Sequence, residues 1–348
     1  MKAVLFCVNP YAFGILKPLY DELLAQGHDN LWYVDKKIQV PFPFGGECPM
    51  TRSISTLISF KPDAHFVPGN EIPHYLRGVK TQVFHGLAGE KKGHFRIREY
   101  FDLYLTQGPY FTEWFGKAAK KHKDFEVKET GWCKLDTLYQ NHPVYLQERK
   151  TLLAQHGKKN LVLYAPTFSP SLTSALIKRD EIFELADRED IYLLIKFHDL
   201  MNADVIDEYK KLAATRKNVQ IVEDRNILKY LIMADVMISD TSSVVYEFIL
   251  LDKPVITINS TSKNINWRDL SSNDSLHKAF VRELKEDPFK NARAVIINEY
   301  HPYSDGKSSL RMIQAVEDYI SRNGVPEKRK LNFYRRYLMN KTFGSSSQ

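Results

Sequence analysis

The chain has 348 residues, of which 43% are hydrophobic and 12% aromatic, and its formal net charge at pH 7 is +7. This length suits two domains, and the composition excludes a disordered or low-complexity chain. With no membrane-spanning run, no signal peptide and only three scattered cysteines, the sequence predicts a cytoplasmic protein without disulfides or a cysteine metal site.

The first 130 residues alternate between short apolar strands and helices. Apolar residues at helical spacing, such as Leu16, Leu19 and Leu23, support the first helix. This alternation predicts a parallel, doubly wound sheet. The expected strands are 2–8, 31–34, 64–67, 81–84, 102–106 and 127–130, and the expected helices are 14–27, 53–60 and 109–121.

A polar stretch at about residues 140–159 separates this half from a second one, where the same pattern restarts. The expected strands there are 161–164, 192–196, 219–222, 234–239 and 255–258, and the expected helices are 180–187, 204–214, 227–233 and 244–251. The fold class predicted is therefore α/β, with two Rossmann-like domains that face a central cleft. We place them at residues 1–145 and 146–319. A basic C-terminal helix at 320–348 then follows, which can cross back to the first domain.

Polar residues gather where the predicted strands end, which is the edge that binds ligands in such folds. They are His85, Thr167, His198 and the run Asp240, Thr241, Ser242 and Ser243. The last run lies between a strand and a helix, where free backbone N–H groups and the helix dipole favour phosphate. Glu247, about one turn into that helix, could accept hydrogen bonds from sugar hydroxyls. The alternative interpretation is an ordinary helix N-cap.

Two histidines are candidate catalytic residues. His85 precedes Gly86 and a loop rich in glycine and lysine (residues 86–93), and a histidine there can act as a general base. His198 follows Lys196 at a strand end of the second half, where the pair could offer cationic or donor groups to a pyrophosphate. The alternative is that each is a hydrogen-bonded loop histidine, but their matching positions favour function.

Several familiar chemistries have no signature in this chain. It contains no P-loop, no Gly-x-Gly-x-x-Gly fingerprint, no Gly-x-Ser-x-Gly elbow and no His-Glu-x-x-His. Nothing in the sequence requires a metal or a cofactor.

Taken in order, four segments resemble the CDP-glycerol glycerophosphotransferases of teichoic acid and capsule synthesis, which are GT-B proteins. The segments are His85–Gly86, 164–167 (Tyr-Ala-Pro-Thr), 196–198 (Lys-Phe-His) and 239–254. The helix expected at 227–235 and the Asp-Gly element at 305–309 also fit. The resemblance covers roughly residues 80–315.

The resemblance implies an enzyme that transfers glycerol phosphate or ribitol phosphate from a CDP-alditol to an acceptor hydroxyl and releases CMP. The acceptor would be a lipid-linked or polysaccharide molecule bound by the first domain, and the donor would lie in the second. His85 would be the general base, and His198 would steady the donor pyrophosphate. Donor-binding residues would be Gly86, Thr167, Lys196, Asp240, Thr241, Ser242, Ser243 and Glu247.

Three features depart from the family pattern. Asp199 replaces the usual proline after the second histidine, Thr241 replaces a tyrosine, and 87–90 (Leu-Ala-Gly-Glu) replaces the common Thr-Pro-x-Lys. The last change leaves the acceptor open. The short chain favours a primase or single-transfer enzyme over a processive polymerase. The alternative function is a GT-B sugar transferase or a UDP-sugar 2-epimerase, which uridine preference would reveal.

Basic and aromatic residues alternate near the C-terminus, from Lys328 through Arg336 to Lys341. This composition suits an anionic membrane surface, and it predicts peripheral attachment at the inner face of the plasma membrane. The competing interpretation is a solvated helix that packs its aromatic side on a neighbouring domain. A basic nucleic-acid or nucleotide-sensing protein is the non-enzyme hypothesis, but no RNA-binding signature supports it, and no nucleic-acid partner is expected.

Overall fold

The computed structural model describes residues 1–87, 94–224, 227–262 and 265–345. It divides into two compact units, one formed by residues 1–139 and 299–348 and the other by residues 140–298. Each unit is built on one parallel sheet, so the predicted α/β class with two doubly wound sheets is confirmed.

The sheet of the first unit has seven strands in the order β3-β2-β1-β4-β5-β6-β7. Every residue from Ala3 to Cys7 in its central strand is fully buried, as expected for a parallel sheet covered on both faces. Its strands are β1 (Lys2–Cys7), β2 (Asp29–Val34), β3 (Met50–Thr51), β4 (Ala64–Val67), β5 (Val79–Gln82), β6 (Leu103–Thr106) and β7 (Glu126–Glu129). Its helices are α1 (Ala12–Ala25), α2 (Ile54–Phe60), α3 (Pro109–His122), α4 (Asp136–Gln140), α12 (Ser308–Asn323) and α13 (Phe333–Phe343).

The second unit has a six-stranded sheet in the order β10-β9-β8-β11-β12-β13. Its core combines the strands with α6, α7 and α10. Its strands are β8 (Asn160–Tyr164), β9 (Ile191–Ile195), β10 (Val219–Ile221), β11 (Val236–Ser239), β12 (Val255–Ile258) and β13 (Arg268–Leu270). Its helices are α5 (His142–His156), α6 (Arg179–Ala186), α7 (Ala203–Ala213), α8 (Ile227–Met233), α9 (Val244–Ile249), α10 (Leu276–Glu286) and α11 (Lys290–Tyr300).

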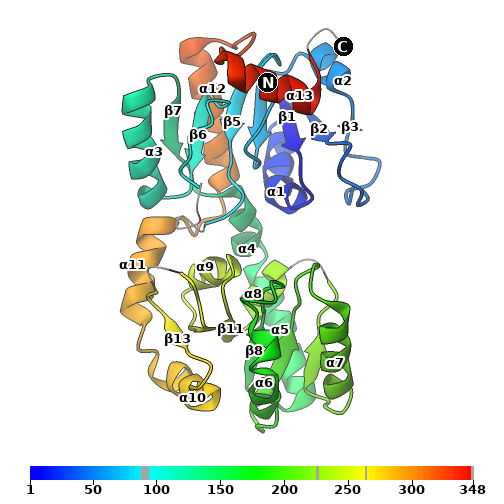
Figure 1. Cartoon of the computed structure of the whole chain (residues 1–348), viewed down its shortest axis with the longest axis vertical. Coiled ribbons are helices and arrows are strands. Elements are labelled where there is room, and N and C mark those ends of the chain that lie inside the picture. The colour runs from blue at the N-terminus through cyan, green and yellow to red at the C-terminus, as the bar shows by residue number, and fades with distance from the viewer. Residues whose placement is uncertain (88–93, 225–226, 263–264, 346–348) are drawn as a thin grey trace. The chain divides into compact units, whose positions relative to one another are not determined.

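The chain returns to the first unit earlier than the sequence predicted. Residues 299–319 were expected in the second domain, but they belong to the first, because α12 packs against α1, β5 and β6 (Figure 1). The polar stretch at 140–159, expected to be a separating segment, contains the helix α5. Leu153 is its one fully buried side chain among the residues described, so helical periodicity was hard to detect.

Arg329, between α12 and α13, fastens the C-terminal segment to this unit. Its guanidinium donates to Asp102 Oδ1 at 2.7 Å, to Asp124 Oδ2 at 2.8 Å and to the carbonyl of Glu99 at 2.5 Å. Asp102 Oδ2 also accepts from the backbone N–H of Lys80. The buried ion pair thus joins residues 227 positions apart and holds the segment before α13 to this unit.

The Asp-Gly element at 305–309 serves the start of α12. The carboxylate of Asp136 accepts from the backbone N–H groups of Ser308 at 2.8 Å and Ser309 at 2.6 Å. Arg311 pairs with Asp305 at 2.7 Å. These contacts occupy two of the free N–H groups of this helix end, so Asp136 acts as a cap that also joins the two segments leading to and from the second unit.

Candidate active site

His85 lies just beyond the carboxyl end of β5, in a sharply turned backbone. Phe84, directly before it, adopts a left-handed conformation (φ 67°), and its ring packs against Phe115 with centroids 5.0 Å apart. A bulky residue rarely takes this conformation unless packing imposes it. The His85 side chain that follows is exposed at the sheet edge.

One hydrogen bond of His85 indicates which nitrogen of its neutral ring carries the proton. Nδ1 lies 3.3 Å from the carbonyl oxygen of Pro68, which can only accept. The neutral ring therefore carries its proton on Nδ1 and its basic lone pair on Nε2. This arrangement suits a general base that acts through Nε2.

Loops after four neighbouring strands hold His85 in place. Gln82 donates to the carbonyl of Gly69 at 2.8 Å and so fixes the loop that carries Pro68. Gln107 donates to the carbonyl of Gly86 at 3.1 Å. The ring of Tyr11, from the loop after β1, lies 5.5 Å from the His85 ring. Tyr11 was missed from the sequence, although its position in the loop after the first strand could have suggested it.

Gly86 is partly exposed, and a methyl group added there would meet no atom of the described residues within 4 Å. Of the glycine- and lysine-rich loop predicted after it, residues 88–93 lie outside the described residues.

Asp240, at the end of β11 in the second unit, is the hub of two loops. Oδ1 accepts from the backbone N–H of Thr167 at 2.8 Å, and Oδ2 accepts from the N–H and hydroxyl of Ser174 at 2.8 and 2.9 Å. Burial raises the pKa of this carboxyl, while these hydrogen bonds lower it. Asp240 is only 1% exposed, so the role that the structure shows for it is to position Thr167 and the loop that carries this residue. Ser174 was not predicted from the sequence.

His198, beyond the end of β9, is fixed in the opposite tautomer from His85. Its Nδ1 accepts from the backbone N–H of Leu200 at 3.1 Å, which leaves the proton of the neutral ring on Nε2. Its ring packs on Phe168 at 4.5 Å. Burial lowers the pKa of His198, and the charge of Lys196 lowers it further, while Asp199 opposes both. The exposed imidazole can thus donate a hydrogen bond while neutral.

Lys196 is mostly buried, and its Nζ donates to the carbonyl of Phe197 at 3.0 Å. The ammonium therefore lies beside the backbone that carries His198. Its charge lowers the pKa of His198, although burial lowers it more.

The run after Asp240 is organised differently from a simple N-cap. Ser243 occupies the cap position without a side-chain cap bond, whereas Ser242 Oγ accepts from the N–H of Val244 at 3.4 Å. Thr241 Oγ1 accepts from the N–H of Thr261 at 3.0 Å. Glu247, expected to meet sugar hydroxyls, is 5% exposed in the first turn of the short helix α9.

The predicted residues thus form two groups. In the second unit, Thr167 and Asp240 are bonded directly, and Ser239 beside them donates to Ala165 at 2.7 Å. In the first unit, His85 and Gly86 share an edge with Tyr11 and Gln107. Within the part of the chain that the structure describes, no three His, Cys, Asp or Glu side chains gather in a metal-binding arrangement.

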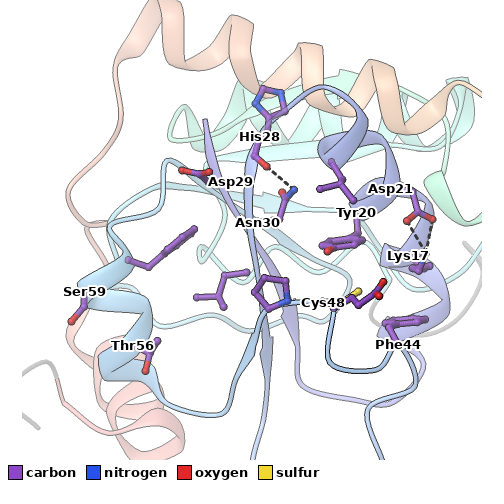
Figure 2. A pocket seen from close by; sticks show the side chains of 15 residues that line it. Lys17, Tyr20, Asp21, His28, Asp29, Asn30, Phe44, Cys48, Thr56 and Ser59 are labelled. Atoms are coloured by element: carbon purple, nitrogen blue, oxygen red, sulfur yellow. Dashed lines mark hydrogen bonds and ion pairs between the residues drawn. The ribbon is translucent and has the colours of Figure 1, made fainter.

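A groove of about 1,000 Å³ lies elsewhere on the first unit (Figure 2). It meets the start of β2 at Asp29 and the end of α1 at Leu24, and Lys17 and Asp21 pair at its wall at 2.6 Å. His85 follows the carboxyl end of β5, so this groove at the opposite ends of the parallel strands is separate from the candidate residues.

Comparisons with known proteins agree on one family. The model of the CDP-glycerol:poly(glycerophosphate) glycerophosphotransferase family matches residues 78–263. The chain is 25% identical over 241 residues to the teichoic acid glycerol-phosphate primase of Bacillus subtilis, covering 63% of this chain and 58% of that protein. It is 24% identical over 276 residues to the teichoic acid ribitol-phosphate polymerase TarL of Staphylococcus aureus, covering 70% of this chain and 46% of that protein. These alignments span about half the length of either relative.

Solved structures share the fold. The wall teichoic acid polymerase TagF superposes with a TM-score of 0.67 at 16% identity, covering 92% of this chain and 89% of that one. A putative UDP-N-acetylglucosamine 2-epimerase from Listeria monocytogenes gives a TM-score of 0.64 at 14% identity, covering 95% of this chain and 99% of that one. Both likenesses support a GT-B-like fold. Because the family model spans more than half of the 348 residues, the chain belongs to the CDP-glycerol:poly(glycerophosphate) glycerophosphotransferase family.

Proposed function

We propose that this protein transfers glycerol phosphate or ribitol phosphate from a CDP-alditol to a hydroxyl group of a teichoic acid-type acceptor. The acceptor oxygen forms a bond to the β-phosphorus, the bond between that phosphorus and the bridging oxygen breaks, and CMP leaves. The acceptor proton passes to a base of the enzyme. We propose that the CDP-alditol is sufficient and that no further cofactor takes part.

The observation that carries this proposal is the pair of exposed histidines with opposite tautomers. The reaction needs one group that removes a proton and one that stabilises the leaving phosphate. Nε2 of neutral His85 has a lone pair, and Nε2 of neutral His198 has a proton. His85 is therefore the proposed base, and His198 is the proposed hydrogen-bond donor to the pyrophosphate.

The remaining donor contacts follow from the loops of the second unit. Thr167, Ser242 and Ser243 would offer hydroxyl groups to the phosphates, because the N–H groups of Thr167 and Ser242 already donate to Asp240. Lys196 would add positive potential, and Asp240 would hold the Thr167 loop. Glu247 would lie deeper, at the sugar or alditol.

The family and its relatives support the choice of donor. The family name specifies CDP-glycerol and poly(glycerophosphate), and the relatives include enzymes named for glycerol phosphate and for ribitol phosphate. A TagF variant was solved after soaking with CDPG. Both alditols therefore remain in the proposal, and product length on a defined acceptor would separate a primase from a polymerase.

Calorimetric titration with CDP-glycerol, CDP-ribitol, CMP and UDP-sugars tests the donor assignment directly. We expect the protein to bind cytidine nucleotides and not UDP-sugars, and to bind them more weakly in His198→Ala. The tighter of the two CDP-alditols would identify the natural donor. Binding of uridine nucleotides alone would move the protein to the sugar transferase or epimerase class, whose fold it shares.

We also propose that the enzyme works at an anionic membrane surface through α13. Phe333, Tyr334 and Tyr337 are 85%, 65% and 57% exposed, while Met339 on the same helix is buried. Aromatic side chains beside Arg336 and Lys341 suit the interface of an anionic bilayer. No helix among the described residues is long and apolar enough to cross a membrane. Co-sedimentation with phosphatidylglycerol vesicles tests this: a triple alanine substitution of the three aromatics should abolish binding.

A further inference from the structure

Most arginines in the described part of the chain form ion pairs with carboxylates, but a group in the first unit does not. Arg96 and Arg98 precede β6, and Arg335 lies in α13. None of these three is within 4.0 Å of a carboxylate oxygen in the described residues. We call these three residues the arginine cluster.

The two segments that carry the cluster are held together by several contacts. Asn332 donates to Glu99 Oε2 at 2.9 Å, and Arg329 donates to the carbonyl of Glu99 at 2.5 Å. The guanidinium of Arg335 lies 5.7 Å from the ring centroid of Tyr100. The charges also act on each other, because Arg96 and Arg335 lower the pKa of Arg98, after the larger effect of burial. Glu71, an exposed carboxylate, has the opposite effect and raises the pKa of Arg98.

The cluster is connected to His85 through one short loop. Arg98 donates to the side-chain oxygen of Asn70 at 3.1 Å, and His85 Nδ1 bonds to the carbonyl of Pro68. Two residues of chain span at most about 7 Å, so the backbone positions of Pro68 and Asn70 are no further apart than this. Gln82 holds the same loop through Gly69. An anion beside Arg98 would therefore lie near the proposed base.

We propose that the arginine cluster is a subsite for the phosphodiester groups of the acceptor strand, which would hold its terminal hydroxyl at His85. This inference rests on the proposed function. Guanidinium groups bind phosphate oxygens through paired, charge-assisted hydrogen bonds. Half-buried Arg98, nearest the loop of His85, would hold a phosphate close to the reacting end. Arg96 and Arg335 would hold phosphates further back along the strand.

The test compares acceptors with and without phosphate. We expect Arg98→Ala to raise the KM for a short oligo(glycerophosphate) roughly tenfold, which is the loss of one charge-assisted contact. The KM for the CDP-alditol and the rate with a neutral glycerol-bearing acceptor should stay unchanged. Arg98→Lys should recover part of the loss. The side chain of Arg96 is exposed and makes no hydrogen bond in the described structure. Arg96→Ala should therefore raise the same KM without affecting folding.

Arg322→Ala is the matched control, because it removes a charge from an exposed arginine of the same unit that pairs with Glu126. An unchanged KM for oligo(glycerophosphate) in Arg96→Ala and Arg98→Ala would overturn the inference. The inference would also be overturned if these variants lost only their binding to phosphatidylglycerol vesicles, because the cluster would then be a lipid-headgroup site. If the wild-type protein transfers nothing from any CDP-alditol, the proposed function fails separately. Calorimetric binding of oligo(glycerophosphate) to wild type and Arg98→Ala then still decides the subsite.

Discussion

Asp240 accepts a hydrogen bond from the backbone N–H of Thr167, a residue 73 positions earlier in the chain, at 2.8 Å. Its other oxygen binds Ser174. One buried carboxylate thus joins the loop after β8 to the loop after β11. The geometry explains why an aspartate stands at this strand end: a carboxylate accepts all three hydrogen bonds, and both of its oxygens are needed.

Replacing Asp240 with asparagine should damage both stability and donor binding. The amide nitrogen cannot accept from Ser174, so a buried donor loses its partner, at a cost of about 1–3 kcal/mol in the free energy of unfolding. The loop with Thr167 should loosen, and the KM for the CDP-alditol should rise. Urea unfolding and steady-state kinetics measure both. Asp190→Asn is the control. Asp190 lies just before β9, at the amino ends of the strands and away from Asp240, so this substitution should leave the KM for the CDP-alditol unchanged.

The role of His198 predicts a graded response to substitution. His198→Ala removes the Nε2 donor and should lower transfer by roughly a hundredfold, the usual effect of losing one donor to a developing negative charge. His198→Gln can still donate from its amide and should recover a measurable part of that loss. If both variants were equally impaired, a donor role would be refuted in favour of a protonated or nucleophilic histidine.

Acid should destabilise the first unit through its buried histidines. Burial lowers the pKa of His301 to about 4, and the backbone N–H of Trp132 donates to its Nε2 at 3.0 Å. In the unfolded chain the histidine protonates below about pH 6.5, while the folded ring stays neutral down to about 4. The unfolded state therefore binds more protons as pH falls through this window, and stability falls with it.

His301 should account for a loss on the order of 2 kcal/mol between pH 7 and pH 5. Urea midpoints at the two pH values measure the loss. His301→Gln, which can still accept from Trp132, should show a smaller difference between the two midpoints. The exposed His122→Gln should show the wild-type difference. An unchanged pH difference in His301→Gln would refute this assignment.

Arg329→Ala should weaken the first unit strongly. The substitution leaves Asp102 buried without its ion-pair partner, which typically costs about 3–5 kcal/mol. Arg322→Ala removes an exposed ion pair in the same unit and should lower the free energy of unfolding by less than about 1 kcal/mol. Denaturant unfolding compares the two, and limited proteolysis should show release of residues 330–345 in Arg329→Ala alone. Equal stabilities would show that this pair does not anchor α13.

The sequence sufficed for the parallel sheets and for the strand ends that carry His85, His198 and Asp240, because apolar runs and their polar termini are local signals. It could not reveal that Asp240 positions Thr167, since that bond depends on two loops far apart in the chain. The early return at Glu299 was equally hidden, because α12 resembles any amphipathic helix and only packing decides which sheet it covers. The helix α5 escaped because most of its side chains are exposed.

Transfer from a labelled CDP-alditol by wild type and His85→Ala tests whether His85 is the general base and whether CMP is the leaving group. We expect wild type to release one CMP for each alditol phosphate added to the acceptor. His85→Ala should lose at least about a hundredfold in kcat while it binds the donor normally. Wild-type transfer without CMP release, or undiminished transfer by His85→Ala, would contradict this mechanism.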